Sequence, residues 1–409
     1  MKLSMIVCCI LLVAFACTKS PVEPDEPIQY VTWDTTYGGP SHDNVMCMTA
    51  TPGGGAIVGG STASFGSGLL DGFLVWFDAN GNPTGRTYGG PQYDHIHSIT
   101  GTNDGGCVTA GFSGWDPLSD LDAWFLRLNS SGGIVWETRY HGIYEQVAEA
   151  YCIAGPSNGH YVAAGYSSGW VRIEDEIIGD YYARKKDEFV IMLDANTGEI
   201  LREVTVYDSS WHFMNIYSMD TFSGGFVLTG LGRIYGCSAR PFLALLDDTL
   251  GVTARIMPDI DGTDFRLSTV KTDNGGFVAI GSIIPPGSEH EQMILMRFSR
   301  SGDVLWYETY GGDRQTYGRS VAVMASGYVL VGYTTPVGST TKDVYVVKTN
   351  KTGEMLKESL YSWKPTSVDL GIDIAVASDG GCVIGARTFP ANFAPGDFFA
   401  IKTDPDGSM

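Results

Sequence analysis

One segment of the sequence has the spacing of a serine nucleophile. Residues 165–169 read Gly-Tyr-Ser-Ser-Gly, which fits the G-x-S-x-G pattern. That chemistry requires a strand, a sharp turn and then a helix around the serine. Here the segment leads into Trp170-Val-Arg-Ile, which has no helical pattern, and Gly111-Phe-Ser-Gly114 occupies the matching place of an earlier repeat. We therefore interpret the match as a product of internal repetition.

Histidines form a second group with possible ligand chemistry. His95 and His97 flank Ile96, so both side chains point to one side of an extended strand. Matching positions of other repeats hold His42 and His212. Imidazoles that converge with Asp43 or Asp94 could bind a metal ion. No dense ligand motif accompanies them, however, and we expect surface or channel-lining histidines, with no metal and no cofactor.

A third group combines aromatic and acidic residues. The segment Gly169–Lys186 joins two apolar runs and is the longest of its kind in the chain. We predict a ligand-binding surface made of Trp115, Trp170, Glu174, Asp175, Tyr181, Tyr182 and Tyr235. Exposed aromatics mixed with carboxylates suit a carbohydrate or a protein partner. The alternative, left open by the sequence, is that these rings pack down on their own domain.

Composition limits the classes of protein to consider. Of 409 residues, 53 are Gly, aromatics make up 12% and charged residues only 18%, which argues against disorder as the main state. No Gly-X-Y period is present, so collagen is excluded. The formal net charge is -20 and no cluster of Lys or Arg occurs, so we expect no nucleic-acid partner.

Self-similarity decides the expected fold. A short phrase of Gly and apolar residues, which begins with Gly-Gly in five copies, occurs seven times, ending at positions 60, 111, 165, 230, 281, 332 and 386. The spacings are 51 to 65 residues, which indicates an array of repeats. Each copy except the last contains four apolar runs, here called strands a to d, and the phrase is strand b. An Asp begins strand a or strand c in most copies, and we expect its side chain to accept backbone N–H hydrogen bonds there.

The turns between the runs favour antiparallel neighbours. Strands c and d are joined by short turns such as Asp78-Ala-Asn-Gly81, which have Asp or Asn early and Gly late. Strands b and c are apolar at consecutive positions and must be covered on both faces. We predict an all-β fold, a seven-bladed β-propeller of four-stranded antiparallel blades. The last copy lacks a strand d, and Tyr30–Tyr37 is expected to complete that blade and close the ring.

The repeat phrases resemble a known group of proteins. Tyr88-Gly-Gly, Asp104-Gly-Gly, Asp122-Ala-Trp-Phe and Gly132-Gly-Ile-Val-Trp136 are similar to the repeats of secreted or lipid-anchored bacterial β-propellers. The resemblance covers nearly all of residues 30–407 and implies a fold but no particular chemistry. We predict that residues 30–409 form a single domain of seven repeats, and we expect a monomer.

The N-terminal sequence predicts a location outside the cytoplasm. Residues 1–16 have a signal-peptide pattern, with Lys2 before a short apolar run. This run ends at Ala14-Phe15-Ala16-Cys17, which resembles a lipoprotein processing site and implies lipidation of Cys17. Residues 17–29 are rich in Pro and acidic residues, as in an extended tether. We expect a lipid-anchored protein of the bacterial cell envelope, outer membrane or surface, which would be secreted if Cys17 is not lipidated.

Five cysteines lie beyond Cys17. They are Cys47, Cys107, Cys152, Cys237 and Cys382. The two pairs that share an aligned column are not in adjacent repeats, so we expect buried thiols and no disulfide.

The sequence favours a non-catalytic propeller that binds a glycan or an envelope protein through its variable b–c connections. The alternative is a glycosidase or lyase at the channel mouth, which would need Glu174 or Asp175 within roughly 5–10 Å of a second carboxylate. A third reading is a structural platform in an envelope complex.

Overall fold

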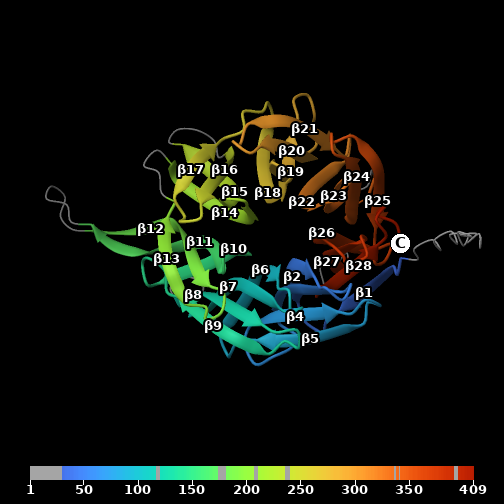
Figure 1. The fold of residues 1–409 in the computed structure, drawn as a ribbon. Coiled ribbons are helices and arrows are strands. Elements are labelled where there is room, and N and C mark those ends of the chain that lie inside the picture. The colour runs from blue at the N-terminus through green and yellow to red at the C-terminus, as the bar shows by residue number, and fades with distance from the viewer. Residues whose placement is uncertain are drawn as a thin grey trace, which may run out of the picture.

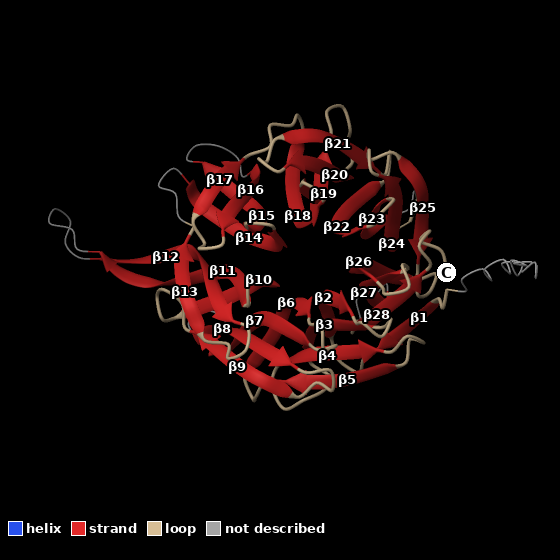
Figure 2. Cartoon of the chain, viewed as in Figure 1, coloured by secondary structure: helices blue, strands red, loops and turns tan. Residues whose placement is uncertain are grey.

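The computed structural model describes residues 30–116, 120–173, 181–206, 211–234, 240–335, 338–339, 341–390 and 395–409. Within these residues the chain is composed of strands and loops, without a helix (Figure 2). Consequently no helix in the described part of the chain could span a membrane. The predicted signal peptide, Cys17 and the tether lie outside the described residues.

Five antiparallel sheets contain four strands each. The first comprises β2 (Asp43–Ala50), β3 (Ala56–Thr62), β4 (Asp71–Phe77) and β5 (Pro83–Tyr88). The next comprises β14 (Trp211–Phe222), β15 (Gly225–Ile234), β16 (Arg240–Asp247) and β17 (Val252–Ile256). It is followed by β18 (Thr263–Asp273), β19 (Gly276–Ile284), β20 (Gln292–Ser299) and β21 (Val304–Tyr310). Then come β22 (Gln315–Val323), β23 (Gly327–Thr335), β24 (Asp343–Asn350) and β25 (Met355–Tyr361). The last comprises β26 (Ser367–Val376), β27 (Cys382–Pro390), β28 (Asp397–Thr403) and β1 (Trp33–Tyr37).

The remaining strands form one eight-stranded sheet, so the prediction of seven separate four-stranded blades is wrong: the structure has five. One half of this sheet holds β6 (Tyr93–Gly101), β7 (Cys107–Asp116), β8 (Asp120–Leu128) and β9 (Ile134–Tyr140). The other half holds β10 (Val147–Ser157), β11 (His160–Ile173), β12 (Tyr181–Asp194) and β13 (Ile200–Thr205).

The two halves are joined where the start of β10 lies beside the start of β8. Val147 pairs with Leu121 in parallel, and Leu121 N donates to the carbonyl of Gln146 over 3.0 Å. A related contact links other neighbouring sheets, as where Asp94 N donates to the carbonyl of Leu70 over 2.7 Å. At β8 and β10 the strands include Leu121 and Val147, so this contact joins two strands and merges their sheets. Spacing in the sequence cannot reveal such a merger, because it depends on where two distant strands begin.

The sheets are arranged around a central axis (Figure 1). The innermost strands are β2, β6, β10, β14, β18, β22 and β26, each contacts the next, and β26 contacts β2. β1 pairs with β28, so the N-terminal strand is the outer strand of the C-terminal sheet. The buried cores lie between neighbouring sheets; one of them joins Val45 and Phe73 to Val383 and Phe398.

Steric crowding explains why glycine ends the repeated phrase in most copies. A Cβ at six of these positions would lie 1.7–1.9 Å from a backbone carbonyl oxygen of the inner strand. These positions are Gly60, Gly111, Gly165, Gly230, Gly281 and Gly332. In every sheet or half-sheet the inner strand has a register shift at this point, which leaves one of its residues unpaired. Such a β-bulge re-aims the side chain of the extra residue.

The Asp prediction is confirmed at several strand starts. Asp43 accepts from Gly39 N at 2.8 Å, Asp94 from Gly90 N at 2.7 Å, and Asp71 from Gly68 N at 2.9 Å. Asp369 accepts from Trp363 N at 3.0 Å. Asp264, near the start of the corresponding strand of the fifth repeat, does not follow this prediction: it is exposed with a φ of 49°, and a register shift between Thr263 and Arg266 interrupts the pairing that Asp43 and Thr62 make in the first sheet.

The cysteine prediction is also confirmed for the described part of the chain. Cys47, Cys107, Cys152 and Cys382 are buried free thiols. Burial raises the pKa of the Cys107, Cys152 and Cys382 thiols to about 12. Cys237 lies outside the described residues.

Candidate functional site

A cavity of about 760 Å³ lies along the axis of the propeller. The inner strands supply most of its lining, including the unpaired residue of every bulge. These residues are Met46, His97, Tyr151, Tyr217, Ser268, Arg319 and Ile372. The repeat therefore aims one side chain per inner strand into the cavity, while the types of side chain differ around the ring. A ring without symmetry is able to bind an asymmetric small ligand.

One side of the cavity is aromatic. His97 and Tyr151 have ring centroids 4.9 Å apart, and Tyr151 stacks on Tyr166 at 5.8 Å. Glu149 accepts hydrogen bonds from the Tyr151 and Tyr166 hydroxyls over 3.1 and 2.8 Å. Tyr217, on the next inner strand, is 39% exposed. Burial raises the pKa of the Tyr151 and Tyr166 phenols, so both remain hydrogen-bond donors at neutral pH.

His97 belongs to this aromatic side but is not charged at neutral pH. Its Nε2 lies 3.9 Å from the Glu149 carboxylate, and its ring is 4.5 Å from that of His95. Burial lowers the pKa of His97 well below its usual value, and burial lowers that of His95 to about 4. The prediction that the two rings share one side of the strand is confirmed. No set of three or more His, Cys, Asp or Glu side chains suited to a metal occurs among the described residues.

The opposite side of the cavity carries cations on consecutive sheets. They are Arg266 and Lys271 on β18, Arg319 on β22 and Arg387 on β27. Arg266 is paired with Glu291 at 2.8 Å. Asp373 is the one carboxylate among the described lining residues. It accepts from Met48 N at 2.9 Å and from the Ser320 hydroxyl at 2.6 Å, and its burial raises its pKa.

Arg319 and Arg387 are the least compensated of these cations. In the described part of the chain neither has a carboxylate within ion-pair distance. The Arg319 guanidinium lies 5.5 Å from the Tyr333 ring centroid, and that of Arg387 lies 5.2 Å from the Phe389 ring centroid. Arg387 Nε is buried without a hydrogen-bond partner. The cavity thus has an excess of positive charge in a chain whose net charge is -20.

The predicted binding surface is only partly described and does not converge on this cavity. Trp115, Trp170 and Tyr182 are 60%, 59% and 68% exposed, and no ring contact joins them among the described aromatics. Tyr181 begins β12. Glu174, Asp175 and Tyr235 lie outside the described residues.

The segment Gly169–Lys186, expected to be a connection between two strands, is itself strand in its described residues 169–173 and 181–186. β11 and β12 continue past the sheet as a hairpin that projects from the ring in Figure 1. Trp170 pairs with Arg184 and Arg172 with Tyr182, so the period-two alternation places these four side chains on one face. This alternation of side chains between two faces is hard to recognise in the sequence, because Gly169 and many charged residues give the segment the composition of a loop. The Gly165–Gly169 phrase lies within β11, which confirms that it is not a nucleophile turn.

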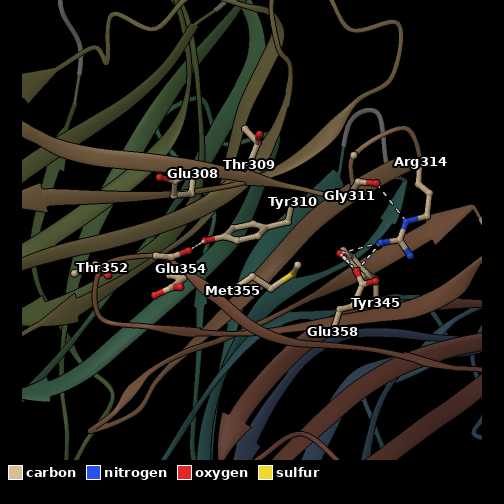
Figure 3. A pocket seen from close by; sticks show the side chains of 12 residues that line it. Glu308, Thr309, Tyr310, Gly311, Arg314, Tyr345, Thr352, Glu354, Met355 and Glu358 are labelled. Carbon is tan, nitrogen blue, oxygen red and sulfur yellow. Dashed lines mark hydrogen bonds and ion pairs between the residues drawn. The ribbon is translucent and has the colours of Figure 1, made fainter.

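A second cavity of about 540 Å³ lies between the outer strands β21 and β25 (Figure 3). Arg314 bonds the Glu358 carboxylate at 2.5 Å and the carbonyl of Gly311 at 3.2 Å. Tyr345 also donates to Glu358, over 2.7 Å, and this bond lowers the pKa of Glu358. These groups satisfy one another's hydrogen-bonding needs across neighbouring sheets, so we interpret the network as structural.

Tyr310→Phe is expected to destabilise the fold by about 1–2 kcal/mol. Tyr310 is buried and donates to the carbonyl of Gly353 in the next sheet over 2.7 Å (Figure 3). Removing its hydroxyl leaves that carbonyl without its partner. Urea unfolding would measure the loss. Tyr307→Phe, on the same strand but 45% exposed, should change stability by less than about 0.5 kcal/mol. Equal effects of both substitutions would contradict a structural role for the Tyr310 hydroxyl.

Comparisons with known proteins identify the fold. No protein-family model matches the chain, and no curated protein matches it. It is similar to the WD40 β-propeller domain of Doa1, with 10% identity, coverage of 93% of this chain and 99% of that chain, and a TM-score of 0.53. It is also similar to the β-propeller domain of the Trilobed protease from Pyrococcus furiosus, with 9% identity, coverage of 90% of this chain and 97% of that chain, and a TM-score of 0.51. The acylaminoacyl peptidase of Pyrococcus horikoshii has 11% identity, coverage of 88% of this chain and 52% of that chain, and a TM-score of 0.51. At these identities the similarity establishes an all-β propeller and nothing about activity.

Proposed function

We propose that this chain is a lipid-anchored binding propeller of the bacterial cell envelope that recognises a glycan or an envelope protein without catalysis. The binding face is the one formed by the connections between the second and third strand of each sheet. The observation that carries the proposal is the projecting β11–β12 hairpin. It presents Trp170 and Tyr182 on one face, each directly opposite an arginine.

This combination of side chains fits recognition. A large exposed ring contributes contact area with little loss of conformational freedom, and an adjacent guanidinium adds hydrogen bonds to a polar partner. Strand pairing places both rings on the same face of a two-stranded ribbon. The hairpin is also the place where one repeat departs from the others, which is expected of a binding element added to a repeated scaffold.

The proposed location rests on the N-terminal sequence. A signal-peptide pattern followed by Cys17 predicts a thioether-linked diacylglycerol on that residue. Labelled palmitate should enter the wild-type chain expressed in a bacterium and should not enter Cys17→Ala. The variant should also leave the membrane fraction and appear in the soluble one. Equal labelling of both chains would contradict the anchor.

The double variant Trp170→Ala with Tyr182→Ala is expected to weaken partner binding at least tenfold. Both rings are more than half exposed, so their loss should leave the fold intact while removing the contact area of the hairpin. A glycan array and co-purification from envelope extracts would measure binding to the two classes of partner. Leu305→Ala and Leu356→Ala, of similar exposure on outer strands, are the matched controls.

The same glycans test the enzymatic alternative. Among the described residues that line the axial cavity, Asp373 is held by backbone N–H groups and a serine, and no second carboxylate accompanies it. Product formation from any bound glycan by the wild-type chain would overturn the non-catalytic proposal. Protein partners that survive loss of both rings would favour a structural platform instead.

A further inference from the structure

We propose that the axial cavity is a binding site for a short oligosaccharide that carries carboxylate groups. The inference rests on the proposed binding function, but it uses a surface separate from the hairpin. It also names the chemical class of the ligand.

The charge distribution of the cavity points to an anion. Arg266 is balanced by Glu291, and Lys271 lies close enough to Asp373 to favour the charged form of that carboxyl group. Arg319 and Arg387 remain, on neighbouring sheets and without a carboxylate partner among the described residues. Arg387 Nε is buried and unpaired, which is costly unless a ligand supplies the missing acceptor. A guanidinium fits the planar geometry of a carboxylate, with two parallel N–H donors.

The opposite wall points to a sugar. Tyr217 and Tyr151 are bulge residues that line the cavity, and the His97 ring lies beside that of Tyr151 with centroids 4.9 Å apart. Aromatic faces bind the apolar C–H faces of a pyranose ring, and hydroxyl donors beside them bind its oxygens. The cavity volume of about 760 Å³ is within the range that encloses a small organic ligand. An aromatic wall facing a cationic wall suits a ligand that has a ring on one side and a carboxylate on the other.

The cations also have an order along the axis. Arg266 is near the start of β18 and Arg387 near the end of β27, which are the ends closest to the b–c connections. Lys271 lies further along the same strand; because of the bulge, its pairing advances by four residues of β19, from Ser282 to Val278, which is roughly 13 Å along the cavity at the usual rise. Arg319 lies between these levels by its strand pairing. A chain with a carboxylate on each sugar can meet more than one of these cations, whereas a single small anion cannot.

The test uses trisaccharides of galacturonate, glucuronate, mannuronate and guluronate, each with its neutral methyl ester. Isothermal titration calorimetry at 20 and 200 mM NaCl would measure affinity for the full chain. We expect at least one acid to bind, its ester to bind at least tenfold more weakly, and the acid to lose affinity at the higher salt concentration. Arg319→Gln should weaken binding of the acid at least tenfold and binding of the ester by less than threefold.

Three controls keep the outcome interpretable. Arg319→Lys preserves the charge and should lose less affinity than Arg319→Gln, which guards against a folding defect. Arg202→Gln, an exposed arginine on the outer strand β13, should bind like the wild type. Tyr217→Ala should weaken binding of acid and ester by the same factor, because the ring contacts the sugar and not its charge.

Several results would overturn the inference. Equal affinity for an acid and its ester, or no binding of any of the four acids, would exclude a carboxylate-selective cavity. If a neutral glycan or a protein binds in those cases and depends on Trp170 and Tyr182, the proposed function stands and only the cavity ligand is wrong. If no glycan and no envelope protein binds the chain at all, the proposed function fails with it.

Discussion

Gly281→Ala is expected to destabilise the propeller by about 3 kcal/mol or more. A Cβ at this position would lie 1.8 Å from the carbonyl oxygen of Arg266 and 2.8 Å from the Cα of Leu267. Both are backbone atoms of the inner strand, so no side-chain rotation relieves the overlap. Overpacking of a buried site costs about 1–3 kcal/mol even where side chains can move, and more where the backbone must shift. Urea unfolding of the wild type and variant would measure the loss.

Gly53→Ala is the matched control, because nothing lies within 4 Å of a Cβ placed there. It should change stability by less than about 0.5 kcal/mol. Gly332→Ala provides a second case, because a Cβ there would lie 1.7 Å from the carbonyl oxygen of Tyr317 on its own inner strand. It should therefore cost at least as much as Gly281→Ala. A Gly281→Ala loss below about 1 kcal/mol would contradict the steric account of the repeat.

Acid should destabilise the fold through the buried histidine pair, by about 3 kcal/mol from His95 alone. Burial lowers the pKa of His95 from 6.5 to about 4, and a pKa difference of one between the folded and unfolded chain corresponds to about 1.4 kcal/mol. The unfolded chain therefore binds more protons than the native chain between these two values. The stability due to the neutral ring is complete above pH 6.5 and is lost as the pH falls towards 4. Burial acts in the same direction on the pKa of His97.

His95→Phe is expected to remove most of this acid sensitivity. His95 stacks on Phe112 with centroids 5.4 Å apart, and its Nδ1 is buried without a hydrogen-bond partner, so a phenyl ring fits the environment. Unfolding free energies measured from pH 7.5 to 4.5 should fall less steeply for His95→Phe than for the wild type. His290→Phe, which replaces an exposed histidine, should follow the wild type. Parallel curves for wild type and His95→Phe would show that other groups cause the acid dependence.

Part of the candidate site could have been located from the sequence. The aligned column that faces the Gly phrase contains Met46, His97, Tyr151, Tyr217 and Arg319, and its variability contrasts with the constancy of the glycine. What the pattern does not reveal is that a bulge turns these residues towards the axis. Alternation along an ordinary strand would place His95 and His97 together but would not distinguish the one that lines the cavity. The hairpin is hard to predict for a related reason, because its exposed polar residues have a loop composition although they alternate.

The sequence by itself determined that the secondary-structure elements are β-strands and the order in which they follow one another. Gly-Gly phrases, short Asp and Gly turns and apolar runs leave the chain few options besides small antiparallel sheets that cover each other's faces. It also determined where Asp43, Asp94 and Asp369 accept backbone hydrogen bonds, because that contact is local. Local contacts depend on neighbouring residues, and these are visible in a single sequence.

Only the tertiary structure decided how the sheets are divided and what faces the axis. The merger of two expected blades depends on Leu121 and Val147 meeting across a sheet boundary, 26 residues apart in the chain. The cationic wall depends on Arg319 and Arg387, which come from different sheets and are 68 residues apart. Each such pairing is set by the closing of the ring, which brings every inner strand to one axis. No spacing within one repeat contains that information.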